Sequence, residues 1–358
     1  MNREWQSDFN PFNSWKVLAW SDHIRGIIDE QFLPPVVVNW DLVLGCNYNC
    51  PHCIWKKRRS LSPTKVPEEF IYKVPKFLHD WGVKAVCIAG ESGDPCLHPQ
   101  LNVALRLLHH WNIEVGIATN GFAMSQETLV AAAHYTKWTG FSMDAGDFSS
   151  YSKVHGVPKE NFGDVLRNIE KLARYIDVHK LPTEVGYKFL ILPDSYHTIA
   201  EGARIARDIG VRDFQIRPAH LPESETSKIN VSILEEQLER AHELATDSFH
   251  VFSVRHKFEG LKKKPQKHCW ATPLTSTWTA TGDVVCCVDL RDEHYNTLCN
   301  YIEEGLPAIK RMWSSQYHLD LIEGINSKLD NCKRCTNGGY NNLIENVFVK
   351  DNMDLRLI

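Results

Sequence analysis

Three cysteines within eight residues constrain this chain more than any other feature. Cys46, Cys50 and Cys53 lie in the stretch Leu44-Gly-Cys-Asn-Tyr-Asn-Cys-Pro-His-Cys-Ile54, directly after an apolar, strand-like run. Their sulfurs can turn toward one point only if the loop wraps a bound group. Thiolates are soft ligands that select zinc, copper or iron–sulfur centres. We therefore predict a metal centre on this loop.

The number of ligands indicates what kind of centre this is. A structural zinc ion or a saturated 4Fe-4S cluster takes four protein ligands, and the loop has three cysteines. His52 is the nearest fourth ligand, but it lies between two cysteines in a tight loop, where its ring packs over a cluster more easily than it bonds to one. One metal position is then open for another molecule, as in catalytic metal sites.

Length and composition set the class of protein. The chain has 358 residues, enough for one large domain with an appendage or for two medium domains. A formal net charge of −4 argues against non-specific nucleic-acid binding as the main activity. We find neither an apolar signal segment nor a run of roughly eighteen apolar residues, so we expect a soluble, cytoplasmic protein. Eleven cysteines in such a chain indicate metal binding more than disulfides.

Apolar, β-branched runs alternate with amphipathic segments along most of the chain. The predicted strands cover residues 36–44, 85–89, 115–119, 140–143, 185–192 and 214–217. The predicted helices cover residues 67–80, 99–111, 126–136, 162–179, 196–209 and 231–246. Six strand–helix units predict an α/β fold with a parallel sheet and helices outside it, a partial (βα)6 TIM-like barrel. The active site of such a barrel lies on the loops after the strands, where the three cysteines also fall.

The pattern changes after residues 261–265. Residues 273–290 are typical of a β-hairpin with Gly282-Asp283 at its turn, and a helix is predicted over 301–323. Four thiolates in this part of the chain suit either a zinc ribbon or a saturated 4Fe-4S cluster, and their spacing does not separate the two. The four are Cys269, Cys287, Cys332 and Cys335, with Cys286 as the alternative to Cys287.

The spacing CxxxCxxC resembles the signature of the radical S-adenosylmethionine (radical SAM) enzymes, with His52 where that family usually has an aromatic residue. The resemblance implies a 4Fe-4S cluster whose open iron is chelated by S-adenosylmethionine, which is cleaved to a 5′-deoxyadenosyl radical. Ser92-Gly93-Asp94-Pro95 resembles the family's Gly-Gly-Glu-Pro segment, which holds the methionine amino group, and Glu91 is the reserve carboxylate. The alternative is a turn that caps a helix.

Further segments match the family pattern in order. Asn120 lies in a Thr-Asn-Gly turn that can contact the cofactor pocket, and Ser142-Met-Asp144 resembles the pair that binds the cofactor ribose. At a period of two, Ser142 and Asp144 are expected on one face of the strand. Further expected contacts are those of Lys153 and His155 with the cofactor carboxylate or the substrate, of Leu190–Leu192 with adenine, and of Arg217 with the methionine carboxylate or an anionic substrate.

The second cysteine set resembles the twitch domain of radical SAM enzymes, which implies one auxiliary 4Fe-4S cluster. The expected organisation is an extension over 1–33, a radical SAM barrel over 34–260, a twitch domain over 261–340 and a tail over 341–358. The expected reaction is oxidation, dehydration or epimerisation of a sugar, an aminocyclitol or a nucleotide-like substrate. Modification of a ribosomal peptide is the alternative, and a non-catalytic zinc protein is the remote one. The four cations Lys56–Arg59 are typical of a solvated surface, and they can also dock a flavodoxin- or ferredoxin-type electron donor or bind a substrate phosphate.

Overall fold

One sheet connects most of the molecule. The computed structural model describes residues 14–55, 63–89, 93–253, 268–291, 294–332 and 335–350. Within them, ten strands pair in the order β12-β11-β10-β1-β4-β5-β6-β7-β8-β9. The strands are β1 Val37–Trp40, β4 Ala85–Ala89, β5 Glu114–Thr119, β6 Trp138–Ser142, β7 Glu184–Ile191, β8 Asp213–Pro218, β9 His250–Ser253, β10 Thr275–Trp278, β11 Asp283–Val285 and β12 Thr297–Asn300. A separate antiparallel pair joins β2 (Val43–Leu44) to β3 (Thr64–Lys65).

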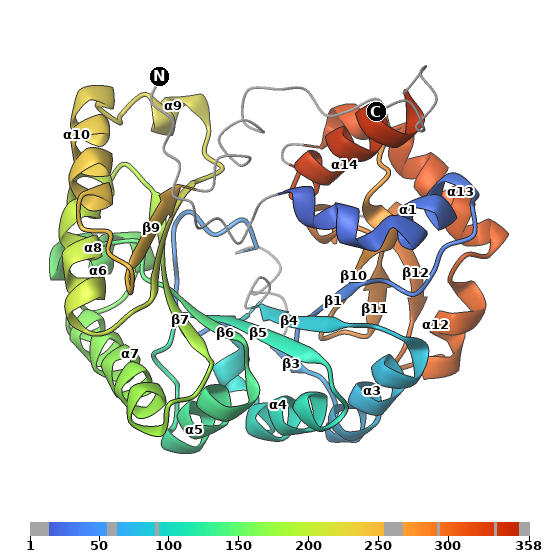
Figure 1. Ribbon diagram of the computed structural model, residues 1–358, viewed down its shortest axis with the longest axis horizontal. Coiled ribbons are helices and arrows are strands. Elements are labelled where there is room, and N and C mark those ends of the chain that lie inside the picture. The colour runs from blue at the N-terminus through green and yellow to red at the C-terminus, as the bar shows by residue number, and fades with distance from the viewer. Residues whose placement is uncertain are drawn as a thin grey trace.

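Helices lie along the outside of the sheet, which is parallel from β10 to β9 (Figure 1). The α/β class with a mostly parallel sheet is therefore confirmed. The helices that connect successive parallel strands are α3 Glu68–Trp81, α4 Leu101–His110, α5 Gln126–Tyr135, α6 Phe148–His155, α7 Glu160–His179, α8 Ile199–Asp208, α9 Glu223–Thr226 and α10 Val231–His242. Strand β9 and helices α6 and α9 are absent from the prediction, because each is short and carries little periodic pattern.

The two faces of the sheet differ in side-chain size. On the helix-facing side, Phe141, Tyr187 and Phe214 are fully buried in the hydrophobic core. On the opposite face, the indole of Trp138 lies over Gly140 and Gly186, where any added Cβ would come within 3.0 Å of it. The small residues on this face leave room for one large ring against the sheet.

The C-terminal part continues the same sheet. Strand β10 pairs in parallel with β1, and the predicted hairpin is present as β10 and β11, with Gly282 at a φ of +98° in its turn. The single helix predicted over 301–323 is wrong. The chain forms α12 (Leu306–Met312) and α13 (Gln316–Asn326) instead, because Ser314 takes a φ of +61° and the Ser315 side chain caps α13 at His318 N.

Short helical turns complete the described chain. They are η1 Ser14–Trp20, η2 Pro95–Leu97, η3 Tyr196–Thr198, η4 Thr272–Leu274, η5 Val288–Leu290, η6 His294–Asn296, η7 Leu329–Asn331 and the π-helical turn η8 Glu345–Val349, with α1 Ser21–Ile28 and α14 Gly338–Ile344 as the remaining helices. Trp313 Nε1 donates to Leu33 O at 2.8 Å, which ties the N-terminal segment to the C-terminal helices.

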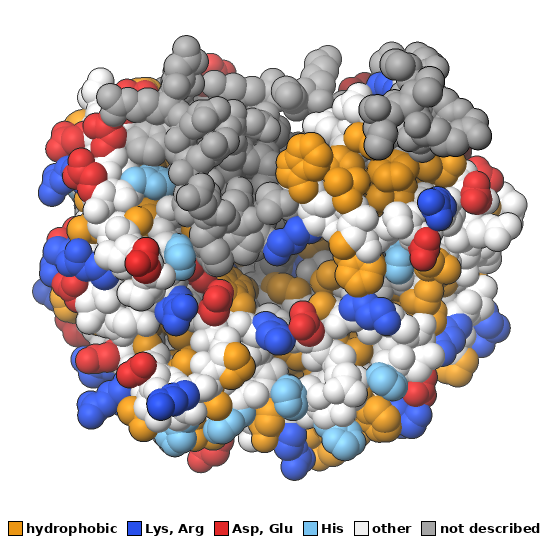
Figure 2. Space-filling view, in the orientation of Figure 1, with side chains coloured by type: hydrophobic (Ala, Val, Ile, Leu, Met, Phe, Trp, Pro, Cys, Tyr) orange, Lys and Arg blue, Asp and Glu red, His pale blue; other side chains and the backbone are white. Residues whose placement is uncertain are grey.

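Hydrophobic side chains gather on the surface where η1 lies beside α14, and Trp15 there is 68% exposed (Figure 2). No helix within the described residues is long and apolar enough to span a membrane.

Candidate functional site

The three-cysteine loop, residues 45–53, follows β2 and rests on the segment after β4. Gly45 has a φ of +144°, a conformation that favours glycine, and it forms a parallel bridge with Gly93. Asp94 N donates to Gly45 O at 2.9 Å, and Cys53 N donates to Cys50 O at 3.2 Å within the loop. Backbone contacts thus help to hold the loop, and its three cysteines are half-buried.

Gly93 is required by this close approach. A Cβ at position 93 would lie 2.3 Å from both Gly45 O and Val43 O. We expect Gly93→Ala to displace the three-cysteine loop, to lower the free energy of unfolding by about 1–3 kcal/mol, and to reduce the iron that the loop retains. Gly324→Ala is the matched control, because no atom lies within 4 Å of its Cβ. Denaturant unfolding and iron analysis check the prediction, which fails if the Gly93 variant retains wild-type iron.

Asn120 and Tyr48 surround the first cysteine. Asn120 Nδ2 donates to Asn47 Oδ1 at 2.8 Å and lies 3.7 Å from Cys46 Sγ. Tyr48 N donates to the same sulfur at 3.4 Å. The Tyr48 and Tyr151 hydroxyls are 3.0 Å apart, and burial raises the pKa of Tyr48 to about 12. Asn120 therefore contacts the three-cysteine loop, whereas the sequence prediction did not include Tyr48 or Tyr151.

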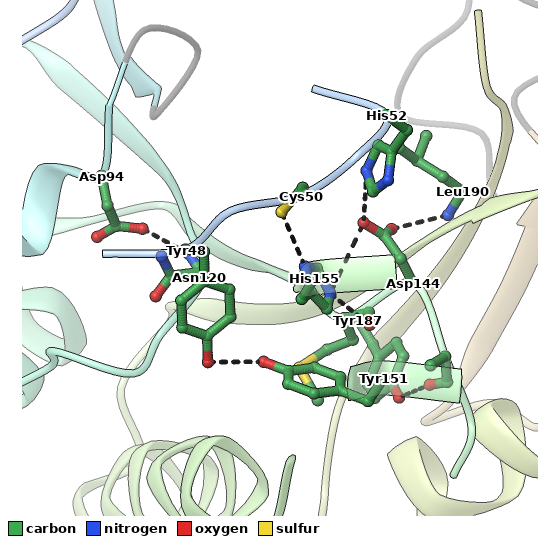
Figure 3. Close-up of polar contacts among 12 residues, drawn as sticks. Tyr48, Cys50, His52, Asp94, Asn120, Asp144, Tyr151, His155, Tyr187 and Leu190 are labelled. Atoms are coloured by element: carbon green, nitrogen blue, oxygen red, sulfur yellow. Dashed lines mark hydrogen bonds and ion pairs between the residues drawn. The ribbon is translucent and has the colours of Figure 1, made fainter. Parts of the chain in front are cut away.

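His155 lies behind the second cysteine (Figure 3). Its Nδ1 is 3.3 Å from Cys50 Sγ, and its Nε2 is 2.9 Å from Met143 O. Because a carbonyl only accepts, Nε2 carries a proton and the ring is held with Nδ1 toward the sulfur. Burial lowers the pKa of His155, and the nearby Asp144 opposes that shift. The structure thus places His155 against the loop itself, while Lys153 on the same helix is exposed.

Asp144 joins three segments of the site. Its Oδ1 accepts from Leu190 N at 2.8 Å, and its Oδ2 lies 3.9 Å from His52 Nε2 and 4.0 Å from His155 Nε2 (Figure 3). Its φ is +53°, because the strand ends at Ser142. Asp144 therefore lies just beyond the strand, and its position on one face with Ser142 and the binding of a ribose by the two both stay predictions.

Asp94 is buried within the protein and is 2% exposed. Its carboxylate accepts from Cys96 N at 3.0 Å, Thr119 Oγ1 at 2.9 Å and Asn120 N at 2.7 Å. Burial raises the pKa of Asp94, and these hydrogen bonds oppose the shift. Its contact with Cys96 N caps η2, which is the alternative role considered for this segment. Contact between Asp94 and a cofactor stays a prediction, and Glu91 and Ser92 lie outside the described residues.

The remaining predicted cofactor residues come from two further strands. Leu192 follows β7 and is 3% exposed. Arg217 on β8 is half-buried, and its Nη2 donates to Gln215 Oε1. Gln215 Nε2 in turn donates to Asp213 Oδ1 at 2.6 Å, and burial raises the pKa of Asp213 to about 6. Polar side chains thus follow one face of β8 up to its carboxyl end. The cations Lys56–Arg59 lie outside the described residues.

The second cysteine set lines one cavity, which we call the four-cysteine site. Its cysteines are Cys269, Cys287, Cys332 and Cys335, and Cys286 is not among the lining residues. Burial raises the pKa of all four thiols, to about 11 at Cys332 and about 12 at Cys335. Metal binding requires thiolates, so a cation at this site would have to offset that cost.

Asn341 lines this cavity, and the sequence prediction did not include it. It is fully buried, and its Nδ2 lies 3.7 Å from Cys269 Sγ and 3.8 Å from Cys335 Sγ. An asparagine on a short helix carries no signal for such a role. Within the described part of the chain, no three His, Cys, Asp or Glu side chains converge closely enough for a single metal ion.

Comparisons with known proteins show which family the sequence resembles. Residues 41–189 match the family model described as the Radical SAM superfamily. An S-adenosylmethionine-dependent nucleotide dehydratase of a Thermoplasmatales archaeon is 28% identical over 142 residues, 39% of this chain and 48% of the relative. A probable GTP 3′,8-cyclase of Pyrobaculum aerophilum is 29% identical over 127 residues, 35% of this chain and 39% of the relative. The chain thus spans less than half the length of these two relatives.

A solved structure extends the likeness in fold to nearly the whole chain. Streptococcus suis SuiB bound to its precursor peptide SuiA superposes with a TM-score of 0.64 and 17% sequence identity, over 96% of this chain and 80% of that chain. At this level of identity the likeness concerns the fold alone.

Proposed function

We propose that the chain is a radical SAM enzyme, because residues 41–189 match the family model of the Radical SAM superfamily. In this proposal it cleaves S-adenosylmethionine reductively and abstracts hydrogen from an unactivated carbon of a small polar substrate. One observation carries the proposal: the three-cysteine loop packs between Asn120 and His155, residues that follow β5 and end α6. Cys46 and Cys50 therefore contact the segments that follow the parallel strands β5 and β6.

The residues present fit a cluster with an open iron. Cys46, Cys50 and Cys53 would hold it, since their sulfurs are partly exposed on one short loop. When bound and reduced, such a cluster supplies the electron that splits the sulfonium of S-adenosylmethionine. Asn120 and Tyr48 N would donate to the Cys46 sulfur, and His155 would hold the Cys50 side chain in place.

The cofactor itself would lie along the ends of neighbouring strands. Gly93 and Asp94 would bind the methionine amino group, and Ser142 and Asp144 the ribose. Leu192 would contact the adenine, and Arg217 would bind a carboxylate through the paired donors that a guanidinium offers. Two contacts of Asp144 support its proposed role in binding the ribose. Its Oδ1 accepts from Leu190 N, and its Oδ2 lies 3.9 Å from His52 Nε2 and 4.0 Å from His155 Nε2. His52 and Lys153 are the remaining proposed contacts.

The C-terminal part is proposed to be a twitch-type domain appended to a partial (βα)6 barrel. The four cysteines that line one cavity support an auxiliary 4Fe-4S cluster there. An electron acceptor in the same chain favours a net oxidation of the substrate. The two curated relatives act on nucleotides according to their descriptions, which supports a nucleotide-like substrate among the sugar, aminocyclitol and nucleotide classes. Dehydration and epimerisation are the other outcomes, and a cytoplasmic flavodoxin or ferredoxin would supply the electron.

Modification of a ribosomally made peptide is the second candidate. The fold of SuiB favours this candidate, because the structure of SuiB was solved with its precursor peptide and its superposition covers 96% of this chain. Release of 5′-deoxyadenosine that depends on a peptide and not on nucleotides or sugars would select this candidate.

Metal analysis after anaerobic reconstitution, combined with an assay for S-adenosylmethionine cleavage, tests the proposal. We expect about eight iron and a matching amount of sulfide per chain, as two cubane clusters require, and release of 5′-deoxyadenosine under reducing conditions. Zinc without sulfide would contradict the enzyme proposal and support a zinc-binding interaction protein. About four iron with one zinc per chain would still support radical chemistry at the three-cysteine loop. It would remove the electron acceptor, so the proposed reaction would be redox-neutral and not an oxidation.

A further inference from the structure

The amide of Asn341 has only one orientation that satisfies its neighbours. Ala271 N donates to Asn341 Oδ1 at 2.7 Å, and a backbone N–H requires an acceptor, so the oxygen must lie on that side. The Nδ2 group is therefore turned the other way, where Cys269 Sγ and Cys335 Sγ lie at 3.7 and 3.8 Å. Its two N–H bonds match two sulfurs of the four-cysteine site.

Burial strengthens this arrangement. Asn341 is 0% exposed, and Cys269, which supplies one of the sulfurs, is 7% exposed. In a medium of low polarity an N–H group directed at a thiolate stabilises negative charge more than it would in water. The contact also joins segments far apart in sequence, since Asn341 and Cys269 are separated by 72 residues.

An acidic group in the same cavity acts in the opposite direction. Asp289 lines the four-cysteine site, and both of its carboxylate oxygens accept from Thr336, from N at 2.6 Å and from Oγ1 at 3.0 Å. A negative charge on this carboxylate disfavours further electron density on the sulfurs. The Asn341 amide counteracts this field as a neutral donor that lies near two of the four sulfurs at once.

We propose that Asn341 is a positioning residue that raises the reduction potential of the auxiliary cluster by donating from Nδ2 to the Cys269 and Cys335 thiolates. This inference rests on the proposed auxiliary cluster. Hydrogen bonds to cluster sulfurs stabilise the reduced, more negatively charged state and are one of the means by which a protein sets the potential. The donor pair therefore makes the cluster a better acceptor for an electron from an oxidised substrate.

The test is a redox titration followed by electron paramagnetic resonance. It uses full-length protein in which Cys46, Cys50 and Cys53 are all alanine, so that signals from the first cluster are absent. In this background we expect Asn341→Leu to lower the midpoint potential of the remaining cluster. Asn326→Leu is the matched control, because Asn326 Oδ1 accepts from Cys269 N at 2.8 Å but contacts the backbone and not the sulfur.

Each outcome bears on one claim. A lower potential in Asn341→Leu together with an unchanged potential in Asn326→Leu supports the inference. An unchanged potential in both variants, or an equal shift in both, overturns it while leaving the auxiliary cluster intact. Zinc or no iron in the parent protein refutes the auxiliary cluster itself. If Asn341→Leu loses its iron, Asn341→Asp decides, because one carboxylate oxygen can accept from Ala271 N in place of Oδ1 while the other cannot donate to a sulfur. A wild-type potential in that variant rejects the inference.

Discussion

Replacing Cys46, Cys50 and Cys53 together with alanine is expected to abolish 5′-deoxyadenosine release and to lower iron from about eight to about four per chain. The fold is expected to persist, because backbone hydrogen bonds hold the loop: Asp94 N donates to Gly45 O, and Asn49 N donates to His155 O at 3.1 Å. Circular dichroism, iron and sulfide analysis, and chromatography of the cleavage products measure the three quantities on one preparation.

Two other cysteine variants serve as controls for this experiment. Cys299→Ala removes a buried thiol outside both cysteine sets, and we expect it to keep full iron and full cleavage. Cys332→Ala combined with Cys335→Ala should lower iron to about four and still allow cleavage of S-adenosylmethionine. Deoxyadenosine release that survives in the first triple variant would refute the assignment of the three-cysteine loop as the site of cleavage.

Replacing Arg291 with methionine is expected to lower the free energy of unfolding by about 3–5 kcal/mol. Arg291 Nη1 donates to Asp41 Oδ2 at 2.5 Å, and the two side chains are 0% and 1% exposed. Removing the guanidinium leaves a buried carboxylate without its ion pair. The guanidinium also lies 5.0 Å from the centroid of the Trp55 ring, which follows the three-cysteine loop. We therefore expect a loss of iron from that loop as well.

A double-mutant cycle isolates the buried pair. Asp41→Leu with Arg291→Met replaces both charges by apolar groups, and we expect it to recover much of the stability that the single variant loses. Arg204→Met is the exposed control, since the pair of Arg204 with Glu201 is about half exposed on each side, and we expect little change in stability. Denaturant unfolding that gives the same midpoint for Arg291→Met and Arg204→Met would contradict the prediction.

The junction around Arg291 also explains how the two cysteine sites are joined. Asp41 precedes β2 and the three-cysteine loop, while Arg291 follows η5, whose N-cap is Cys287. The ion pair therefore connects the segment that precedes the three-cysteine loop with the segment that follows Cys287 of the four-cysteine site, and the two residues are 250 positions apart in sequence. Strand β10, paired in register with β1, supplies the backbone part of the same connection.

The amino-acid sequence alone determined those features that depend on neighbouring residues. Five of the six predicted strands and the predicted helices between them are present because apolar periodicity is a local pattern, whereas the strand predicted over 36–44 is divided into β1 and β2, which belong to different sheets. The hairpin turn is present because Gly282 tolerates a positive φ. The CxxxCxxC spacing likewise predicted the radical SAM domain that the family comparison supports. The domain boundaries and the ligand sets of both clusters stay predictions.

Only the tertiary structure decided which distant side chains meet. His155 reaches Cys50 across 105 residues and Asn341 reaches Cys269 across 72, and no local pattern encodes either contact. Asp144 lies near both His52 and His155, at 3.9 and 4.0 Å, and the sequence pattern contains no sign of these contacts. The helix predicted over 301–323 breaks at Ser314, whose amide donates to His318 Nδ1 at 3.1 Å. Such contacts arise from the pairing of strands into one sheet, and their partners are set by three-dimensional proximity and not by spacing along the chain.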